Sequence, residues 1–121
     1  IPHAGGSVYA AAKSGVSSLT KTIAAELAPY NIRVVGYIPG MIATDMSTET
    51  IAERRDELVA ATALHRLGRP EDLARPLVFL ASDACAYMTG CDIEVSGGKY
   101  CVQNSEYSWE LARAEQEKNR Q

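Results

Sequence analysis

Tyr9 and Lys13 are the two side chains of this 121-residue sequence whose types and spacing best suit acid–base chemistry. They stand four positions apart, so on a helix they project from the same face about one turn apart. A nearby ammonium group favours the phenolate and lowers the pKa of a tyrosine from its free value of about 10. Such a tyrosine can exchange a proton with an alcohol or a carbonyl near neutral pH. Taken alone, the pair is weak evidence for catalysis, because chance matches are common and most are a surface lysine beside a half-buried tyrosine.

Pro39 and Gly40 form a second candidate position, because they directly follow a β-rich segment over 32–38. Apart from Arg33 near its start, that segment is apolar on both faces. This pattern is typical of a parallel strand that helices cover on both sides. Open α/β sheets bind ligands beyond the carboxyl ends of their strands. The sequence therefore predicts a ligand beside the Pro-Gly turn.

Cysteine and histidine predict no further chemistry. Cys85, Cys91 and Cys101 are odd in number and show no Cys-x-x-Cys spacing, so we expect reduced thiols rather than disulfides or a zinc site. His3 and His65 lie far apart without a metal-ligand pattern and are interpreted as ordinary side chains. No metal site is predicted.

Composition narrows the class of protein. The chain is 46% hydrophobic and 22% charged, and its length allows one domain with a sizeable core. A net charge of −3 argues against nucleic-acid binding, which needs a basic patch. No apolar run approaches the roughly 20 residues of a membrane helix, and no signal peptide is visible, so we expect a cytoplasmic protein. Because the sequence does not begin with Met, we expect the natural product to start upstream of residue 1.

Helices and strands alternate along the chain to position these residues. Apolar side chains recur at helical spacing over 7–28, with Ser7 as the expected N-cap and Pro29 closing the helix. The remaining predicted elements are strands over 32–38 and 91–95, a loop over 41–47, and helices over 48–60, 70–81 and 105–119. This order predicts an α/β fold.

Two strands make an incomplete sheet. A two-stranded parallel sheet can neither cover its faces nor satisfy its edges. The strand over 32–38 therefore needs neighbours on both sides. We expect a part of a larger fold, or a chain that completes its sheet with a partner.

The segment around Tyr9 and Lys13 resembles the active-site helix of the short-chain dehydrogenase/reductase family, and the resemblance continues along the chain. The matching segments are 7–16, 19–21, 25–28, 31–34, 39–46, 66–74, 79–83, 88–90 and 93–98. They keep the order and spacing of the family. The chain is identified as a member, similar to the carboxyl-terminal half of its doubly wound parallel (Rossmann) sheet over 1–100, followed by a polar tail over 101–121.

The resemblance implies a role for each matched residue. Tyr9 matches the general acid/base that protonates the carbonyl oxygen or deprotonates the alcohol. Lys13 matches the residue that lowers the tyrosine pKa and hydrogen-bonds the nicotinamide ribose. The implied activity is hydride transfer between NAD or NADP and a ketone or secondary alcohol.

Four further positions match the nicotinamide side of the family's site. They are Pro39, Gly40, Ile42 and Thr44. The first two match the turn beside the nicotinamide, and the other two match positions that contact its carboxamide. The alternative for Thr44 is a cap on the short segment that follows it.

Several family features have no counterpart in this sequence. The Thr-Gly-x-x-x-Gly-x-Gly turn that holds the cofactor diphosphate does not occur, and the glycine pairs at 5–6 and 97–98 have the wrong spacing. The catalytic serine falls upstream of Ile1, and Ser7 is not given that role. The residues that select NAD or NADP are also missing. We therefore expect the missing amino-terminal half as a partner and no activity from this chain alone.

Residues 45–66 and the tail leave alternatives open. The segment 45–66 matches the substrate-binding loop, but its mixture of apolar and charged side chains identifies no substrate. In the tail, Tyr107, Trp109 and Leu111 allow docking on a neighbouring subunit, and a frayed polar helix is the alternative.

Two functional hypotheses result. The first is an oxidoreductase, assembled as a homodimer or homotetramer, that acts on a small carbonyl or alcohol substrate and binds neither nucleic acid nor membrane. The second is a catalytically inactive truncated relative that serves as an assembly or interaction protein. Binding of a nicotinamide dinucleotide discriminates between them.

Overall fold

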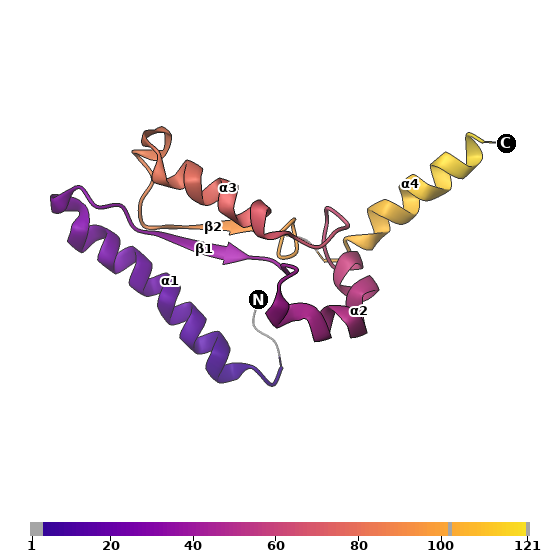
Figure 1. The fold of residues 1–121 in the computed structure, drawn as a ribbon, viewed down its shortest axis with the longest axis horizontal. Helices are drawn as coiled ribbons and strands as arrows, with labels where there is room; N and C mark the ends of the chain where they lie inside the picture. The colour runs from indigo at the N-terminus through magenta and orange to yellow at the C-terminus, as the bar shows by residue number, and fades with distance from the viewer. Residues whose placement is uncertain (1–3, 102, 121) are drawn as a thin grey trace. The chain divides into compact units, whose positions relative to one another are not determined.

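The computed structural model describes residues 4–101 and 103–120, and its elements follow the predicted order (Figure 1). The helices and strands are α1 (Ser7–Leu27), β1 (Val35–Pro39), α2 (Thr48–Ala60), α3 (Pro70–Ala81), β2 (Cys91–Val95) and α4 (Glu106–Lys118). Short 3-10 helices are found at Ala28–Tyr30, Asp45–Ser47 and Asp83–Cys85.

The chain divides into two compact units. Unit 1 comprises the described residues up to Ile38 together with Ala74–Glu94, and unit 2 comprises Pro39–Leu73 and the described residues from Val95 onward. The elements β1, β2 and α3 each contribute residues to both units. The sequence-based boundary at residue 100 stays a prediction.

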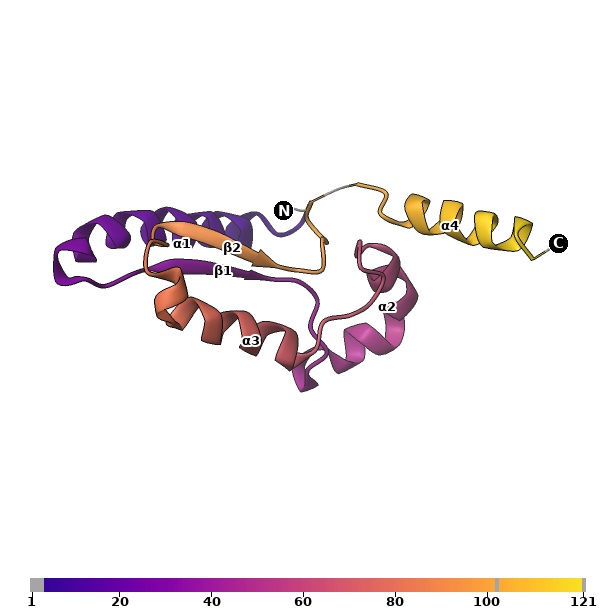
Figure 2. The same cartoon turned by 90° about the horizontal axis from the view of Figure 1, so that it is seen from above.

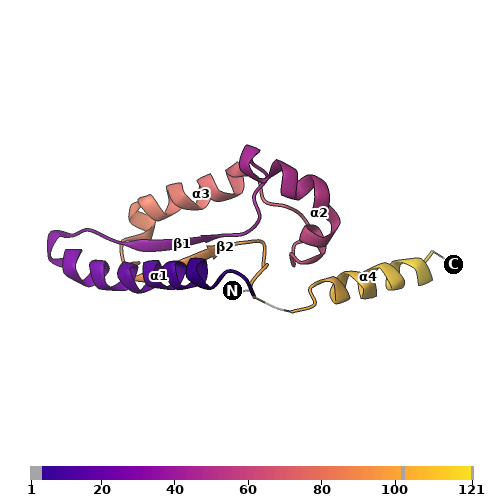
Figure 3. The ribbon, with the colours of Figure 1, turned by 90° about the horizontal axis from the view of Figure 1, so that it is seen from below.

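Unit 1 is built on a two-stranded parallel sheet of β1 and β2. In the register of the two strands, Gly36 lies beside Asp92, whose carboxyl group occupies the space that a Cβ atom would take. The helix α1 lies on one face of the sheet and α3 on the other, as Figures 2 and 3 show. The predicted covering of the strand by helices on both sides is therefore confirmed.

Hydrogen bonds connect these layers. Ser17 on α1 donates to the carboxylate of Asp92 on β2. On the other face, the guanidinium of Arg33 donates to the carbonyl oxygen of Leu80 at the end of α3, at 2.8 Å. Hydrogen bonds thus connect α1 to β2, and α3 to the residues that lead into β1.

Little of the apolar surface is buried. Among the described residues, the buried apolar side chains are those of Ala24, Leu58 and Cys85. By contrast, Val16 on α1 and Val78 on α3 are exposed, the latter to 72%. The expected sizeable core is therefore not found, because a two-stranded sheet offers too little area for its helices. This agrees with the expectation that the sheet lacks neighbours.

Beyond one-residue shifts at element ends, three features differ from the prediction. The N-cap of α1 is Gly6, and no side-chain hydrogen bond caps the helix, so Ser7 does not have the predicted role. The first strand begins at Val35 rather than Ile32, since the amide of Val34 bonds a threonine side chain at 3.1 Å instead of extending the ladder. The predicted loop over 41–47 contains the 3-10 helix Asp45–Ser47.

Candidate active site

Tyr9 and Lys13 lie side by side on α1 in unit 1. The ammonium nitrogen of Lys13 is 5.4 Å from the centroid of the Tyr9 ring. The Tyr9 side chain is 62% exposed, so its hydroxyl is open to an incoming molecule. The predicted proximity is found, and the catalytic role of the pair stays a prediction.

Gly40 stands in unit 2, where the chain leaves β1 immediately after Pro39. Its amide donates to the carbonyl oxygen of Val95 at 3.1 Å, which brings the two backbones together. A Cβ atom at Gly40 would lie 2.6 Å from the carbonyl oxygen of Ser96 and 2.7 Å from its Cα atom. Only glycine fits this approach without a backbone shift. The predicted turn therefore has a local structural reason for its glycine.

Ile42 continues the segment and forms an isolated parallel bridge with Gly68. The amide of Ala43 donates to the carbonyl oxygen of Gly68 at 2.9 Å. The amide of Gly68 in turn donates to the carbonyl oxygen of Met41, also at 2.9 Å. These bonds fix the backbone around Ile42 against the segment that leads into α3.

Thr44 is the N-cap residue of the 3-10 helix Asp45–Ser47. Its amide donates to the hydroxyl oxygen of Ser47 at 2.9 Å, and the two hydroxyl oxygens lie 3.3 Å apart. The alternative interpretation of Thr44 as a cap is thus confirmed. Its contact with a cofactor stays a prediction, and its side chain is exposed.

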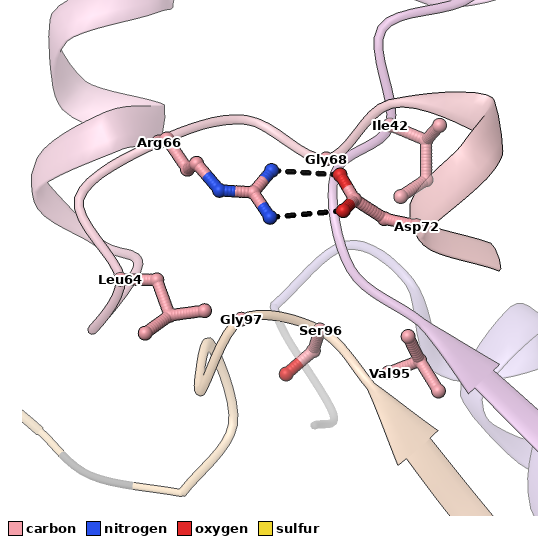
Figure 4. Close-up of a pocket in the computed structure, with 8 residues that line it drawn as sticks. All are labelled: Ile42, Leu64, Arg66, Gly68, Asp72, Val95, Ser96 and Gly97. Atoms are coloured by element: carbon pink, nitrogen blue, oxygen red, sulfur yellow. Dashed lines mark hydrogen bonds and ion pairs between the residues drawn. The ribbon is translucent and has the colours of Figure 1, made fainter. Parts of the chain in front are cut away.

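A small pocket of about 130 Å³ lies in unit 2 (Figure 4). Its lining residues are Ile42, Leu64, Arg66, Gly68, Asp72, Val95, Ser96 and Gly97. The volume is well below the roughly 300–1,000 Å³ of common ligand pockets, so it can hold only a small part of a ligand. Of the residues predicted from sequence, Ile42 lines it, whereas Tyr9 and Lys13 belong to unit 1.

Arg66 and Asp72 form a two-pronged ion pair beside this pocket. The guanidinium nitrogens of Arg66 lie 2.7 and 2.9 Å from the carboxylate oxygens of Asp72 (Figure 4). The backbone amide of Arg69 adds a third bond to the same carboxylate at 2.8 Å. These donors hold the pKa of Asp72 far below its usual value, the Arg66 side chain being the largest cause. This pair was not predicted from the sequence.

We expect Asp72 to remain ionised at pH 3.8, where an unperturbed aspartate is half protonated. Its folded-state pKa is depressed, so the pair stabilises the fold above the ordinary carboxyl range and the contribution is lost as pH falls through the lowered pKa. An NMR titration of the Asp72 carboxyl carbon measures this directly. The Arg66→Gln variant should titrate at a higher pH than the wild type. Ordinary titration in the wild type would contradict the assignment.

His65 is the residue that sequence reasoning interpreted least well. Its ring stacks on Trp109 with centroids 4.6 Å apart, and its Nε2 atom lies 2.7 Å from the carboxylate of Glu106. His65 therefore connects the segment that follows α2 with helix α4 and is not an isolated side chain. No signal in the sequence could pair it with residues so distant along the chain. His3 lies outside the described residues.

The side chains of Tyr9 and Lys13 can be compared with the groups that a nicotinamide dinucleotide presents. The ammonium of Lys13, beside the exposed phenol of Tyr9, is a hydrogen-bond donor of the kind that suits the hydroxyl groups of a ribose. The sequence in hand holds no glycine-rich turn of the kind that binds a cofactor diphosphate.

Two features are absent from the described residues. Within 4–101 and 103–120, no group of three or more histidine, cysteine or acidic side chains is arranged to hold a metal ion. In the same part of the chain, no helix combines the length and apolar character that a membrane crossing requires.

Comparison with known proteins identifies the family. Residues 1–99 match the family described as enoyl-(acyl carrier protein) reductase. The sequence is 44% identical over 94 residues to L-rhamnose 1-dehydrogenase (NAD(P)(+)) of Azotobacter vinelandii, covering 76% of this chain and 37% of that protein. It is 42% identical over 98 residues to 3-oxoacyl-(acyl-carrier-protein) reductase FabG of Pseudomonas aeruginosa, covering 81% of this chain and 40% of that protein.

A solved structure agrees with this match. A short-chain type dehydrogenase/reductase from Mycobacterium marinum superposes with a TM-score of 0.71 and 43% identity, over 79% of this chain and 37% of that protein. The chain belongs to the short-chain dehydrogenase/reductase family, an oxidoreductase family with a Rossmann fold whose members use a nicotinamide cofactor. It spans little more than a third of the length of the curated relatives that it matches.

Proposed function

We propose that this chain supplies the proton-transfer half of an NAD(P)-dependent oxidoreductase that interconverts ketones and secondary alcohols. The assembled enzyme denotes this chain together with the amino-terminal half that would complete its sheet and bind the cofactor diphosphate. The observation that carries the proposal is the Lys13 ammonium beside the exposed Tyr9 phenol, on one face of α1. The chain alone is proposed to be inactive.

Tyr9 would move the proton of the reaction. In the reductive direction its hydroxyl gives a proton to the carbonyl oxygen, and in the oxidative direction its phenolate takes the proton from the alcohol. The positive charge of Lys13 stabilises the phenolate that remains. When bound, the nicotinamide supplies or accepts the hydride that balances this proton.

The nicotinamide side of the site is proposed to include four residues of unit 2. They are Pro39, Gly40, Ile42 and Thr44. Their position where the chain leaves β1 supports this role, since open α/β sheets bind ligands at such ends.

The substrate is proposed to be a small ketone or secondary alcohol. One relative named above has a sugar, L-rhamnose, in its name and another has 3-oxoacyl-(acyl-carrier-protein), so relatedness alone selects neither substrate. A homodimer or homotetramer is proposed because α1 and α3 present exposed apolar side chains, including Val16 and Val78.

Lys13→Ala should lower kcat/KM and weaken nicotinamide affinity together, each by about tenfold or more, because one charged hydrogen-bond donor serves both. Steady-state kinetics and a cofactor titration of the assembled enzyme measure the two effects. Lys21→Ala, an exposed lysine on the same helix, is the matched control and should change neither. An unchanged Lys13→Ala variant would refute the assigned role of this lysine.

The second candidate is an inactive relative that acts in assembly. The exposed apolar side chains of α1 and α3 favour it. A stable assembly that contains this chain and binds no nicotinamide dinucleotide would decide for this candidate.

A further inference from the structure

Asp92 on β2 places a carboxyl group in the layer between the sheet and α1, the helix on one face of the sheet (Figure 3). The hydroxyl of Ser17 on α1 donates to this carboxylate, and both residues are partly buried. A carboxylate in such a layer is unfavourable unless hydrogen bonds compensate for the water that it loses. Asp92 has no part in the proposed proton transfer, so its position calls for a separate explanation.

Gly36 on the neighbouring strand β1 provides the space for this carboxyl group. A Cβ atom at Gly36 would lie 3.0 Å from the Cγ atom of Asp92 and closer still to one of its carboxylate oxygens. The backbone of Asp92 is clear of that position, since its Cα atom lies at 3.6 Å. A side chain at Gly36 would therefore turn the carboxyl group aside rather than move the strand. The bond from Ser17 thus depends on the glycine.

The contact at Ser17 lies where α1 begins to be covered. Between Ser7 and Val16, every residue except Ala10 is exposed. Further along the helix, partly or fully buried residues recur at helical spacing, at positions 17, 20, 23, 24 and 27. Within the part of the chain that the structure describes, the supported length of α1 therefore begins at the bond between Ser17 and Asp92.

Tyr9 and Lys13 belong to the exposed part of the same helix. Lys13 lies about one turn and Tyr9 about two turns before Ser17, on the same side of α1. At a rise of about 1.5 Å per residue, roughly 12 Å separates Tyr9 from Ser17, so a tilt of about 5° would move Tyr9 by about 1 Å. A displacement of about 1 Å can lower the rate of an enzyme about a hundredfold. Small changes at Ser17 would therefore be felt at the pair.

We propose that Asp92 is a positioning residue for the pair of Tyr9 and Lys13. Its carboxylate, placed over Gly36 and bonded by Ser17, fixes α1 against β2 and so holds the exposed part of the helix in one direction. The positioning of the pair rests on the proposed function, whereas the dependence of the Ser17 bond on Gly36 does not.

Denaturant unfolding of the assembled enzyme tests the dependence on Gly36. Gly36→Ala alone should lower the free energy of unfolding, because the carboxyl group must leave its bond with Ser17. In an Asp92→Ala background the same substitution should be neutral or stabilising, since the added methyl group then has room. Equal losses in the two backgrounds would show that the Asp92 carboxyl group does not fill this space, and would overturn the proposal.

Steady-state kinetics of the assembled enzyme test the positioning role, with each rate expressed per folded molecule. Ser17→Ala and Asp92→Ala should each lower kcat about tenfold, as a displacement smaller than about 1 Å would. The double variant should lose no more than either single variant, because both act through one bond. Asp92→Asn should recover most of the rate, since its amide oxygen accepts the same bond. Ser18→Ala, exposed on the same helix, is the matched control and should leave kcat unchanged.

The outcomes separate this proposal from the proposed function. An unchanged kcat in Ser17→Ala and Asp92→Ala, or losses that add up in the double variant, would overturn the positioning role. Turnover that does not depend on Tyr9 would instead refute the proposed function. The positioning of the pair would then be refuted with it, whereas the coupling of Gly36 and Asp92 in unfolding would remain.

Discussion

Replacement of Tyr9 by phenylalanine is expected to lower kcat of the assembled enzyme by about 10²–10⁴-fold. The substitution removes one hydroxyl and keeps the ring, so the helix and its neighbours should be unaffected. Tyr9 is 62% exposed, so its hydroxyl contributes little to the stability of the fold. Phenylalanine at this position should therefore not destabilise the protein. The affinity for the nicotinamide dinucleotide should therefore remain close to that of the wild type.

Tyr30→Phe provides the matched control for this experiment. Tyr30 follows α1 in the 3-10 helix Ala28–Tyr30 and is 73% exposed. Its loss of a hydroxyl should change neither kcat nor cofactor affinity. Substantial turnover by Tyr9→Phe would show that another group moves the proton.

Replacement of Gly40 by alanine should have the largest effect on stability. The added Cβ atom would meet the carbonyl oxygen and the Cα atom of Ser96 at 2.6 and 2.7 Å, and both belong to the backbone. Neither can turn aside as a side chain would, so the segments must move apart. We expect the free energy of unfolding to fall by about 1–3 kcal/mol, the usual cost of such overpacking.

Denaturant unfolding measures this difference, and Gly15→Ala is the matched control. Gly15 lies within α1, and a Cβ atom there would meet nothing within 4 Å. Since glycine weakens a helix relative to alanine, the control should be neutral or more stable by up to about 1 kcal/mol. Equal stability of the two variants would contradict the packing argument at Gly40.

The order of the elements could be predicted because each one has a local pattern. The helical spacing of apolar residues over 7–28 and the apolar segment over 32–38 both led to elements that the structure contains. The start of β1 could not be predicted in this way. Val34 has the composition of a strand residue, but its amide bonds the side chain of Thr89, far along the sequence.

In the candidate site, too, contacts between neighbours in the sequence could be predicted, and contacts between distant residues could not. The proximity of Tyr9 and Lys13 and the capping position of Thr44 depend on neighbours within one turn, so the sequence contains them. The contact of His65 with Glu106 spans 41 positions and depends on how the tail packs. Only the folded chain can bring such residues together, which is why His65 was interpreted as an ordinary side chain.

Nicotinamide-dependent turnover decides whether Tyr9 moves the proton of an oxidoreductase. The assembled enzyme would be mixed with reduced nicotinamide dinucleotide and a panel of ketones that includes a sugar-derived ketone and a 3-oxoacyl thioester. We expect the cofactor to bind and to be oxidised with at least one ketone, and we expect Tyr9→Phe to bind it without oxidising it. An assembled protein that binds no nicotinamide dinucleotide, or one whose turnover persists in Tyr9→Phe, would refute this role of Tyr9.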